Sequence, residues 1–314
     1  MKLGVGLPVA GQWATPDNQI RLARHAEALG YHSLWAFQRL LYPVEPKNEY
    51  YGAPGRAWPE PFRRVADPIV SLAFIAGATK TIRLGTRVLI MPFYQPIVLA
   101  KQLATLDVIS RGRLNVGLGL GWSQDEYEAV SVPFRRRGAR ADEFLRCLTA
   151  IWSDDPVEFR GEFYFVPKST IQPKPVQTPR PPITIGGYSK QVFRRAATLA
   201  DGYNGGNIPF AELTSILRQL GEAAEGAGRD PASLEIVCRG SFQVYDAPPG
   251  PNRRALWGTL DEIREDIRRY AELGVTELFL EANFQAGGAE IDRVLYATEA
   301  LAPARLSGRA GAEP

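Results

Sequence analysis

The residues of greatest chemical interest form a short glycine-rich segment, Gly186-Gly187-Tyr188-Ser189, between an expected strand and an expected helix. Glycines let the backbone approach an anion closely, the free amides at a helix N-terminus point toward it, and Ser189 adds a hydroxyl. One interpretation is a seat for a phosphate group. The other is a tight turn followed by a serine that caps the helix.

A second glycine-rich segment, Gly117-x-Gly119-x-Gly121-Trp122, ends another expected strand. Glycines there would leave a flat wall against a planar ring, with Trp122 lining it. The alternative is a strand end that glycine has only weakened. The run Arg135-Arg136-Arg137 follows. It is either a solvated basic face or a grip on the anionic tail of a cofactor.

The elements that must position these residues alternate between strands and helices along the chain. Helix starts are indicated by Thr15-Pro16 and by the capping box Thr259-Leu260-Asp261-Glu262. Such alternation implies parallel strands, and eight strand–helix units fit an α/β fold, the closed (β/α)8 TIM barrel. The expected strands cover residues 2–9, 33–37, 82–91, 113–120, 182–185, 203–205, 234–244 and 277–282.

An open, doubly wound sheet is the alternative fold. Its Gly-x-Gly-x-x-Gly loop should follow the first strand, where this chain has Pro8-Val9-Ala10-Gly11 instead. Two long insertions are expected, one after the second strand (39–66) and one before the fifth (154–181), which holds a hairpin candidate at 159–165. We expect one barrel domain over residues 1–306 and a flexible tail over 307–314.

Composition excludes several functional classes. The 37 Lys+Arg residues nearly balance the 34 Asp+Glu residues, and this net charge of +3 argues against a nucleic-acid-binding protein. No apolar run approaches the ~18 residues of a membrane span, and the N-terminus lacks a signal-peptide pattern, so a cytoplasmic location is expected. Cys147 and Cys238 are expected to be core thiols, and two cysteines with two histidines predict no metal site.

In such a barrel the active site lies at the C-terminal ends of the strands. The residues expected there are poor in acid–base groups and rich in glycines, aromatic rings and amides. That composition suits a planar cofactor that carries out the chemistry itself. The candidates at these ends include Phe37, Gln38, Arg39, Leu89, Ile90, Gly119, Gly121, Trp122, Gly205 and the segment 186–189.

Several motifs together resemble one family, the bacterial luciferase-like flavin and deazaflavin oxidoreductases. The resemblance spans residues 3–301. It rests on Leu84-Gly85-Thr86-Arg87-Val88-Leu89, Ala100-Lys101-Gln102-x-Ala104-x-Leu106-Asp107, Ser110-x-Gly112-Arg113, Gly117-x-Gly119-x-Gly121-Trp122, Arg137-Gly138-x-Arg140-x-Asp142-Glu143, Pro173-Lys174-Pro175-Val176-Gln177, Pro181-Pro182-Ile183-x-Ile185-Gly186-Gly187 and Ala200-Asp201-Gly202.

The resemblance implies a TIM barrel with a cofactor at its C-terminal rim. That cofactor is either FMN, used with molecular oxygen, or coenzyme F420, used for hydride transfer. The sequence is more similar to the F420-dependent branch. In that branch a cis peptide bond in the third strand supports the ring, and here it would be Arg87–Val88. Family members are often homodimers, which we therefore expect.

The sequence departs from the family at two positions. Many members end the second strand with Asp-His, where this chain has Gln38-Arg39, and the family's sugar-phosphate dehydrogenases place a glutamate where this chain has Trp122. That dehydrogenase activity is therefore not carried over. Arg39 could stabilise an anionic deazaflavin or polarise a substrate carbonyl, but its pKa is too high for a general base.

The resulting hypothesis is hydride transfer between F420 and an apolar or aromatic substrate, unsaturated or carbonyl-containing. The first alternative is an FMN-dependent monooxygenase supplied by a separate reductase, and the second is a non-catalytic flavin-binding barrel. A longer F420 tail would need a basic track, for which 135–137 and Arg63-Arg64 are candidates. Arg39 and Gln38 are the predicted catalytic residues. The predicted cofactor-binding residues are Arg87, Val88, Leu89, Ile90, Gly119, Gly121, Trp122, Gly186, Gly187, Tyr188, Ser189 and Gly205. The predicted substrate pocket comprises Phe37, Tyr42, Tyr51 and Trp58.

Overall fold

A computed structural model of the chain, which describes residues 1–50, 55, 57–285 and 288–306, has eight parallel strands closed into a barrel. The sheet order is β3-β2-β1-β13-β10-β9-β8-β5-β4, and pairing of β3 with β5 completes the circle. The predicted (β/α)8 barrel is therefore confirmed. The strands are β1 (Lys2–Gly6), β2 (Ser33–Ala36), β3 (Arg83–Thr86) with its continuation β4 (Leu89–Ile90), β5 (Leu114–Gly119), β8 (Ile183–Gly186), β9 (Gly202–Gly205), β10 (Glu235–Ser241) and β13 (Glu277–Glu281).

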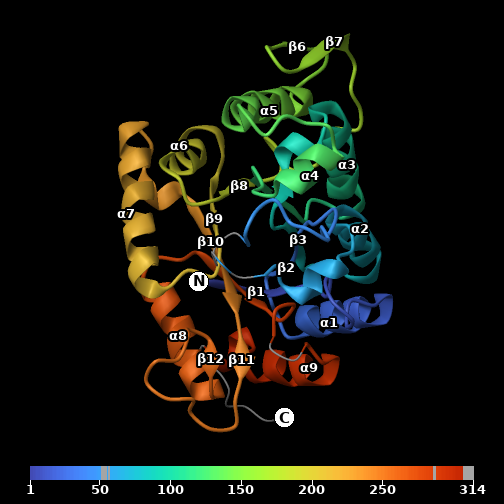
Figure 1. The fold of residues 1–314 in the computed structure, drawn as a ribbon. Coiled ribbons are helices and arrows are strands. Elements are labelled where there is room, and N and C mark those ends of the chain that lie inside the picture. The colour runs from blue at the N-terminus through green and yellow to red at the C-terminus, as the bar shows by residue number, and fades with distance from the viewer. Residues whose placement is uncertain (51–54, 56, 286–287, 307–314) are drawn as a thin grey trace.

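Helices surround the strands on the outside (Figure 1). The Thr15 hydroxyl accepts a hydrogen bond from the Asn18 amide at the first helix, and Thr259 and Glu262 form the predicted capping box. No helix in the described ranges is long and apolar enough to cross a membrane. The helices that cover the barrel are α1 (Pro16–Ala28), α2 (Pro68–Ala78), α3 (Pro96–Ile109), α5 (Arg137–Trp152), α6 (Lys190–Leu199), α7 (Phe210–Gly226), α8 (Leu260–Glu272) and α9 (Ile291–Ala300).

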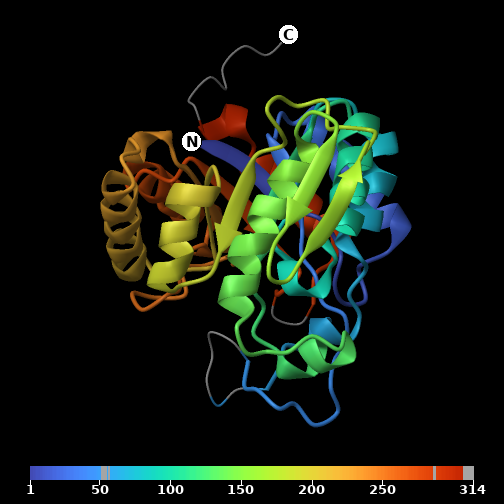
Figure 2. The ribbon, with the colours of Figure 1, turned by 90° about the horizontal axis from the view of Figure 1, so that it is seen from above.

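The insertions lie outside the barrel. The predicted hairpin is confirmed as the antiparallel pair β6 (Val157–Arg160) and β7 (Phe165–Ser169), beside α5 (Figures 1 and 2). The segment after β2 ends in a 3-10 turn, η1 (Glu60–Arg63), and lies with the short helix α4 (Gln124–Ala129) at one end of the molecule in Figure 2. Smaller elements are η2 (Met91–Phe93), η3 (Pro231–Ser233), β11 (Gln243–Val244), β12 (Trp257–Gly258) and α10 (Pro303–Leu306).

Two elements differ from expectation. The predicted third strand, 82–91, is interrupted between β3 and β4 at the Arg87–Val88 peptide bond, which is cis, as the family resemblance implied. Helix α4 was not predicted. Its start is marked by Ser123, whose hydroxyl accepts a hydrogen bond from the Glu126 amide. The tail 307–314 lies outside the described residues.

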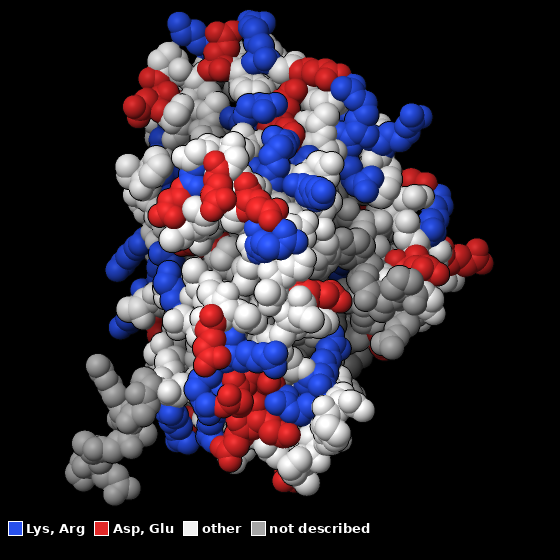
Figure 3. All heavy atoms as spheres, turned by 90° about the vertical axis from the view of Figure 1, so that its left-hand side faces the viewer, with Lys and Arg blue, Asp and Glu red and all other residues white. Residues whose placement is uncertain are grey.

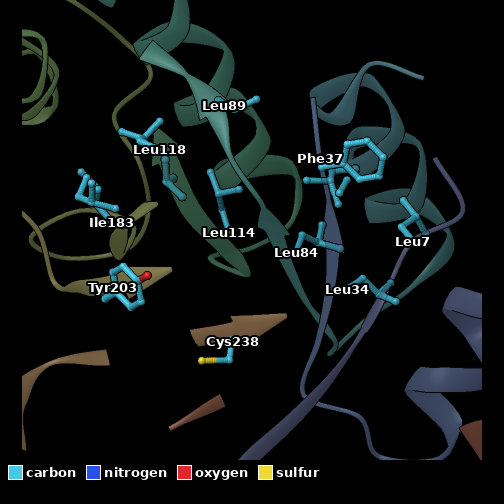
Figure 4. Packing of buried hydrophobic residues seen from close by; sticks show 14 of the residues in the cluster. Leu7, Leu34, Phe37, Leu84, Leu89, Leu114, Leu118, Ile183, Tyr203 and Cys238 are labelled. Carbon is cyan, nitrogen blue, oxygen red and sulfur yellow. The ribbon is translucent and has the colours of Figure 1, made fainter. Parts of the chain in front are cut away.

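The core has two parts because successive side chains on a strand face opposite sides. Outward-facing residues such as Leu34, Leu84 and Leu114 pack against the helices (Figure 4). Inward-facing Trp35 and Phe279 stack inside the barrel with ring centroids 5.4 Å apart. The thiols of Cys147 and Cys238 are both buried and free, as predicted.

Surface charge is mixed in sign. On the face that Figure 3 shows, Lys and Arg side chains are interspersed with Asp and Glu side chains. This agrees with the net charge of +3. The fields of such interspersed charges largely cancel at a distance.

Candidate active site

A cavity of about 470 Å³ opens at the C-terminal ends of the barrel strands. Its wall includes residues contributed by β5, β8, β9 and β10, together with residues that follow β2, β3 and β13. This is the end of a TIM barrel where active sites occur. The predicted site residues that line the cavity are Phe37, Gln38, Arg39, Arg87, Val88, Ile90, Gly119, Gly121, Trp122, Gly186, Gly187, Tyr188 and Ser189.

Other predicted site residues lie behind the wall. Leu89 is fully buried in the core, and Gly205 is a buried residue at the end of β9. Trp58 is buried with its indole against that of Trp122, at a centroid distance of 4.7 Å, and Tyr42 packs against Trp58. Tyr51 lies outside the described residues.

A glycine-lined wall surrounds Val88, which follows the cis peptide bond. A Cβ atom built on Gly119 would lie 2.6 Å from Val88 Cγ2, and one built on Gly186 would lie 2.9 Å from Val88 Cγ1. Both distances are too short for real carbon contacts. The absence of side chains at these two positions therefore allows Val88 to stand between them at the cavity surface.

The segment 186–189 leads from β8 into α6 at the edge of the cavity. Gly187 has φ of +140°, a conformation that favours glycine. Ser189 occupies the N-cap position, yet in the described part of the chain its side chain makes no capping hydrogen bond. Arg137 also lines the cavity, with its guanidinium 3.8 Å from the Phe134 ring centroid. The N-terminus of α6, a hydroxyl and a cation thus border one cavity.

The other predicted basic residues lie elsewhere. The exposed Arg136 forms an ion pair with Glu162, and the exposed Arg63 forms one with Glu60. Neither belongs to the cavity wall, and neither does Arg64. Within the described residues, Arg137 is therefore the one member of the two predicted basic clusters that lines the cavity.

Arg39 forms a buried ion pair with Glu126 of α4. Arg39 Nη1 lies 2.6 Å from Glu126 Oε2, and the other carboxylate oxygen accepts a hydrogen bond from the Leu40 amide at 2.7 Å. The guanidinium lies 4.7 Å from the Trp122 ring centroid and 5.2 Å from that of Phe62. Burial raises the pKa of Glu126, and the positive charge of Arg39 opposes that shift. The charge of Arg39 is thus compensated within the protein.

Gln38 connects β2 to the strand beside it. Its Oε1 accepts a hydrogen bond from the Ile90 amide at 2.8 Å, and its Nε2 donates to the Tyr94 hydroxyl. The side chain is 4% exposed. Because both ends of the amide are engaged, the geometry gives Gln38 a positioning role at the cavity wall.

The floor of the cavity contains polar groups that are not among the predicted catalytic, cofactor-binding or substrate-pocket residues. Arg239 of β10 and Asn204 of β9 line it, and Glu281 of β13 is buried nearby. Asn204 Nδ2 donates to Thr184 Oγ1 at 3.1 Å, while its buried Oδ1 has no hydrogen-bond partner within the described residues. The signal that could have identified these residues is the period of two along each strand, which places them inside the barrel. For Glu126, the signal was the Ser123-x-x-Glu126 pattern of a helix start.

The fold and this cavity define a TIM-barrel protein with a cofactor-sized site at its C-terminal rim. The family model for luciferase-like monooxygenase matches residues 2–249, so the chain belongs to the luciferase-like monooxygenase family. Members of this family are oxidoreductases and monooxygenases.

The proteins to which the chain is similar carry descriptions that differ in cofactor. The chain is 32% identical to an uncharacterised protein of Mycobacterium tuberculosis over 88% of this chain and 90% of that protein. It is 33% identical to the oxygenase component of the flavin-dependent trigonelline monooxygenase of Acinetobacter baylyi, over 54% of this chain and 42% of that one. The solved structure of an F420-dependent secondary alcohol dehydrogenase superposes with a TM-score of 0.78 at 18% identity, covering 97% and 99% of the two chains.

Proposed function

We propose that this protein is an F420-dependent oxidoreductase that transfers a hydride between the deazaflavin and an apolar or aromatic substrate, unsaturated or carbonyl-containing. The observation that carries the proposal is the composition of the cavity wall. Among its described residues there is no His, Cys, Lys, Asp or Glu. Among these residues the hydroxyl groups have no general base beside them to activate them, which fits a reaction whose chemistry comes from a bound cofactor.

The residues present fit such a cofactor. The wall formed by Val88 between Gly119 and Gly186 would support the planar ring, since a side chain at either glycine would overlap Val88. The amides of Gly187, Tyr188 and Ser189, with the Ser189 hydroxyl and Arg137, would hold the phosphate. When bound, the deazaflavin supplies the carbon that gives or accepts the hydride.

The aromatic insertion after β2 would keep water from the substrate. Phe37, Phe62 and Trp122 line the cavity, and Trp58 packs behind Trp122. Water exclusion strengthens every electrostatic interaction in the site. Arg39 then acts chiefly by holding this insertion to α4 through Glu126, and polarisation of a substrate carbonyl is its secondary role.

An FMN-dependent monooxygenase is the second candidate. It is favoured by the similarity to the trigonelline enzyme, whose description as an oxygenase component implies a separate reductase. The cavity would hold FMN through the same wall and phosphate seat, without the basic track that a longer tail requires. Among the described residues, Arg137 is the one member of the two predicted basic clusters on the cavity wall, which supports this candidate.

The test is a titration of cofactor-free protein with F420 and with FMN, followed by tryptophan fluorescence. We expect micromolar binding of F420, at least tenfold weaker binding to Ser189→Ala, and little change for Ser153→Ala, an exposed serine remote from the cavity. Preference for FMN would favour the monooxygenase. Failure of both to bind, or binding with no reaction toward any acceptor, would overturn the hydride-transfer proposal, and the latter result would indicate a non-catalytic barrel.

The proposal includes a homodimer. Helices α2 and α3 pack side by side and expose apolar side chains, with Val70 69% and Val98 51% accessible. Adjacent exposed apolar residues favour association with another protein surface. Light scattering coupled to gel filtration should give twice the chain mass, and Val70→Asp should shift it toward the monomer. A monomeric wild type would contradict the proposal.

A further inference from the structure

Two arginine side chains occupy the floor of the cavity, one from the end of β3 and one from β10. Both Arg87 and Arg239 line the cavity. Arg87 Nη2 donates a hydrogen bond to the Gly205 carbonyl at 2.8 Å. The buried Nε atom of each arginine has no hydrogen-bond partner within the described residues. Buried guanidinium N–H groups without partners are costly, so the floor is chemically incomplete as it stands.

The charges at the floor do not balance. Glu281 is the buried carboxylate of this layer, and its Oε1 accepts hydrogen bonds from the Asn283 amide and side chain at 2.9 and 2.6 Å. In the described part of the chain no ion pair joins Glu281 to either arginine. Burial and the neighbouring charge of Arg239 lower the pKa of Arg87 to about 10, so Arg87 remains cationic at neutral pH. Burial raises the pKa of Glu281, and the charges of Arg239 and Arg87 oppose that shift. Two guanidinium groups therefore face at most one carboxylate charge in this layer.

Arg239 is the member of the pair that lies away from the phosphate seat, whereas Arg87 directly precedes Val88 of the glycine wall. The guanidinium of Arg239 lies 5.0 Å from the ring of Phe284, which stacks on Phe37 at 5.4 Å. Phe284 follows β13, and β13 lies four strands from β5 around the closed barrel in either direction. The aromatic rings beside Arg239 are therefore across the barrel from Gly119, on the side left for the substrate when a ring lies against the glycine wall.

We infer that Arg239 and Arg87 bind a carboxylate group of the organic substrate, whose aromatic or apolar body lies against Phe284 and Phe37. The planar guanidinium fork matches a carboxylate, and hydrogen bonds between charged groups are the strong ones. An anion there would satisfy the two Nε–H groups and balance the excess positive charge. The inference narrows the substrate class of the proposed function and rests on it for the cavity as the reaction site.

The experiment is isothermal titration of cofactor-free protein with benzoate and with its neutral analogue benzamide. We expect benzoate to bind ten- to a hundredfold more tightly, the range typical of a hydrogen-bonded charge pair. Arg239→Gln should abolish this preference, and Arg239→Lys should retain part of it. Arg137→Gln, which removes an arginine at the phosphate seat of the same cavity, should leave the preference intact. Thermal unfolding by circular dichroism checks that each variant is folded.

Three results would overturn the inference. They are equal binding of benzoate and benzamide, no binding of benzoate up to roughly 10 mM, and a preference for benzoate that survives Arg239→Gln. A second arm distinguishes a substrate anion from an anionic part of the cofactor. Benzoate should still bind after saturation with whichever of F420 or FMN binds, whereas its displacement would assign the arginines to the cofactor. If neither cofactor binds, the proposed function fails while the titration with benzoate alone still decides whether the anion site exists.

Discussion

Removing Glu126 should destabilise the protein strongly, because it would leave the buried guanidinium of Arg39 without its carboxylate. The Arg39 and Glu126 side chains are 9% and 1% exposed, and their atoms approach to 2.6 Å. Breaking a buried ion pair by removing one partner costs about 3–5 kcal/mol. The unfolding entropy is about 2.1 cal/mol/K per residue. For 314 residues this amounts to about 0.66 kcal/mol/K, so Glu126→Ala should lower Tm by about 5–8 °C.

The assay is thermal unfolding followed by circular dichroism, with Glu128→Ala as the matched control. Glu128 lies on the same short helix and pairs with Lys47, but its side chain is 62% exposed. Exposed pairs contribute about 0–1 kcal/mol, so this control should lower Tm by less than about 2 °C. A double variant, Arg39→Met with Glu126→Leu, should recover most of the loss because an apolar pair needs no charge compensation.

A Glu126→Ala shift no larger than that of the control would refute the reasoning. It would mean that Glu126 does not compensate the charge of Arg39 in the folded protein. That result would support the catalytic role predicted for Arg39 from the sequence. A failure of the double variant to recover stability would instead indicate that the loop after β2 depends on the polar contacts themselves, including the Leu40 amide bonded to Glu126.

Two further predictions concern the glycine wall and the acid side of the stability profile. Gly119→Ala should weaken cofactor binding at least tenfold in a fluorescence titration, because the new Cβ would push Val88 into the cavity. The control Gly77→Ala should leave the affinity unchanged, because a Cβ there meets nothing within 4 Å. Equal affinities of the two variants for the cofactor would contradict this prediction. Burial, with the nearby positive charges of Lys2 and Arg83, lowers the pKa of His32 to about 4. As pH falls, His32 takes up a proton in the unfolded chain before it does so in the folded protein. The contribution of neutral His32 to the free energy of unfolding is therefore complete above about pH 6.5 and is lost as pH falls toward 4. The full difference between the folded and unfolded pKa values of His32 corresponds to about 3 kcal/mol of stability. Because the ring is partly exposed, we expect about 1–2 kcal/mol of this to be observed. The free energy of unfolding, measured with urea from pH 7 to 4, should therefore depend less on pH for His32→Gln than for the wild type. Parallel pH profiles of the two proteins would contradict this prediction.

Local chemistry determined much of the fold. The caps at Thr15 and Thr259, the alternation of strands with helices and the hairpin 159–165 are encoded within a few neighbouring residues, which is why they could be predicted. Because parallel strands in a closed barrel all end on one rim, the residues after each strand were also predictable as cavity candidates. Many of them line one cavity in the structure.

Pairings between distant segments could not be predicted. Arg39 and Glu126 are 87 residues apart, and only barrel closure brings the loop after β2 against α4. The break at Arg87–Val88 separates β4 from β3, and Leu89, a predicted cofactor-binding residue, is buried in the core beside it.

The meeting of Arg87 with Arg239 at the cavity floor depends in the same way on strand order and register. The sequence by itself determined which elements form and which residues stand at their ends, because both follow from local periodicity and capping. Tertiary structure alone decided which side chains are neutralised and which charges remain for a ligand, because electrostatic pairing depends on distance in space and not along the chain.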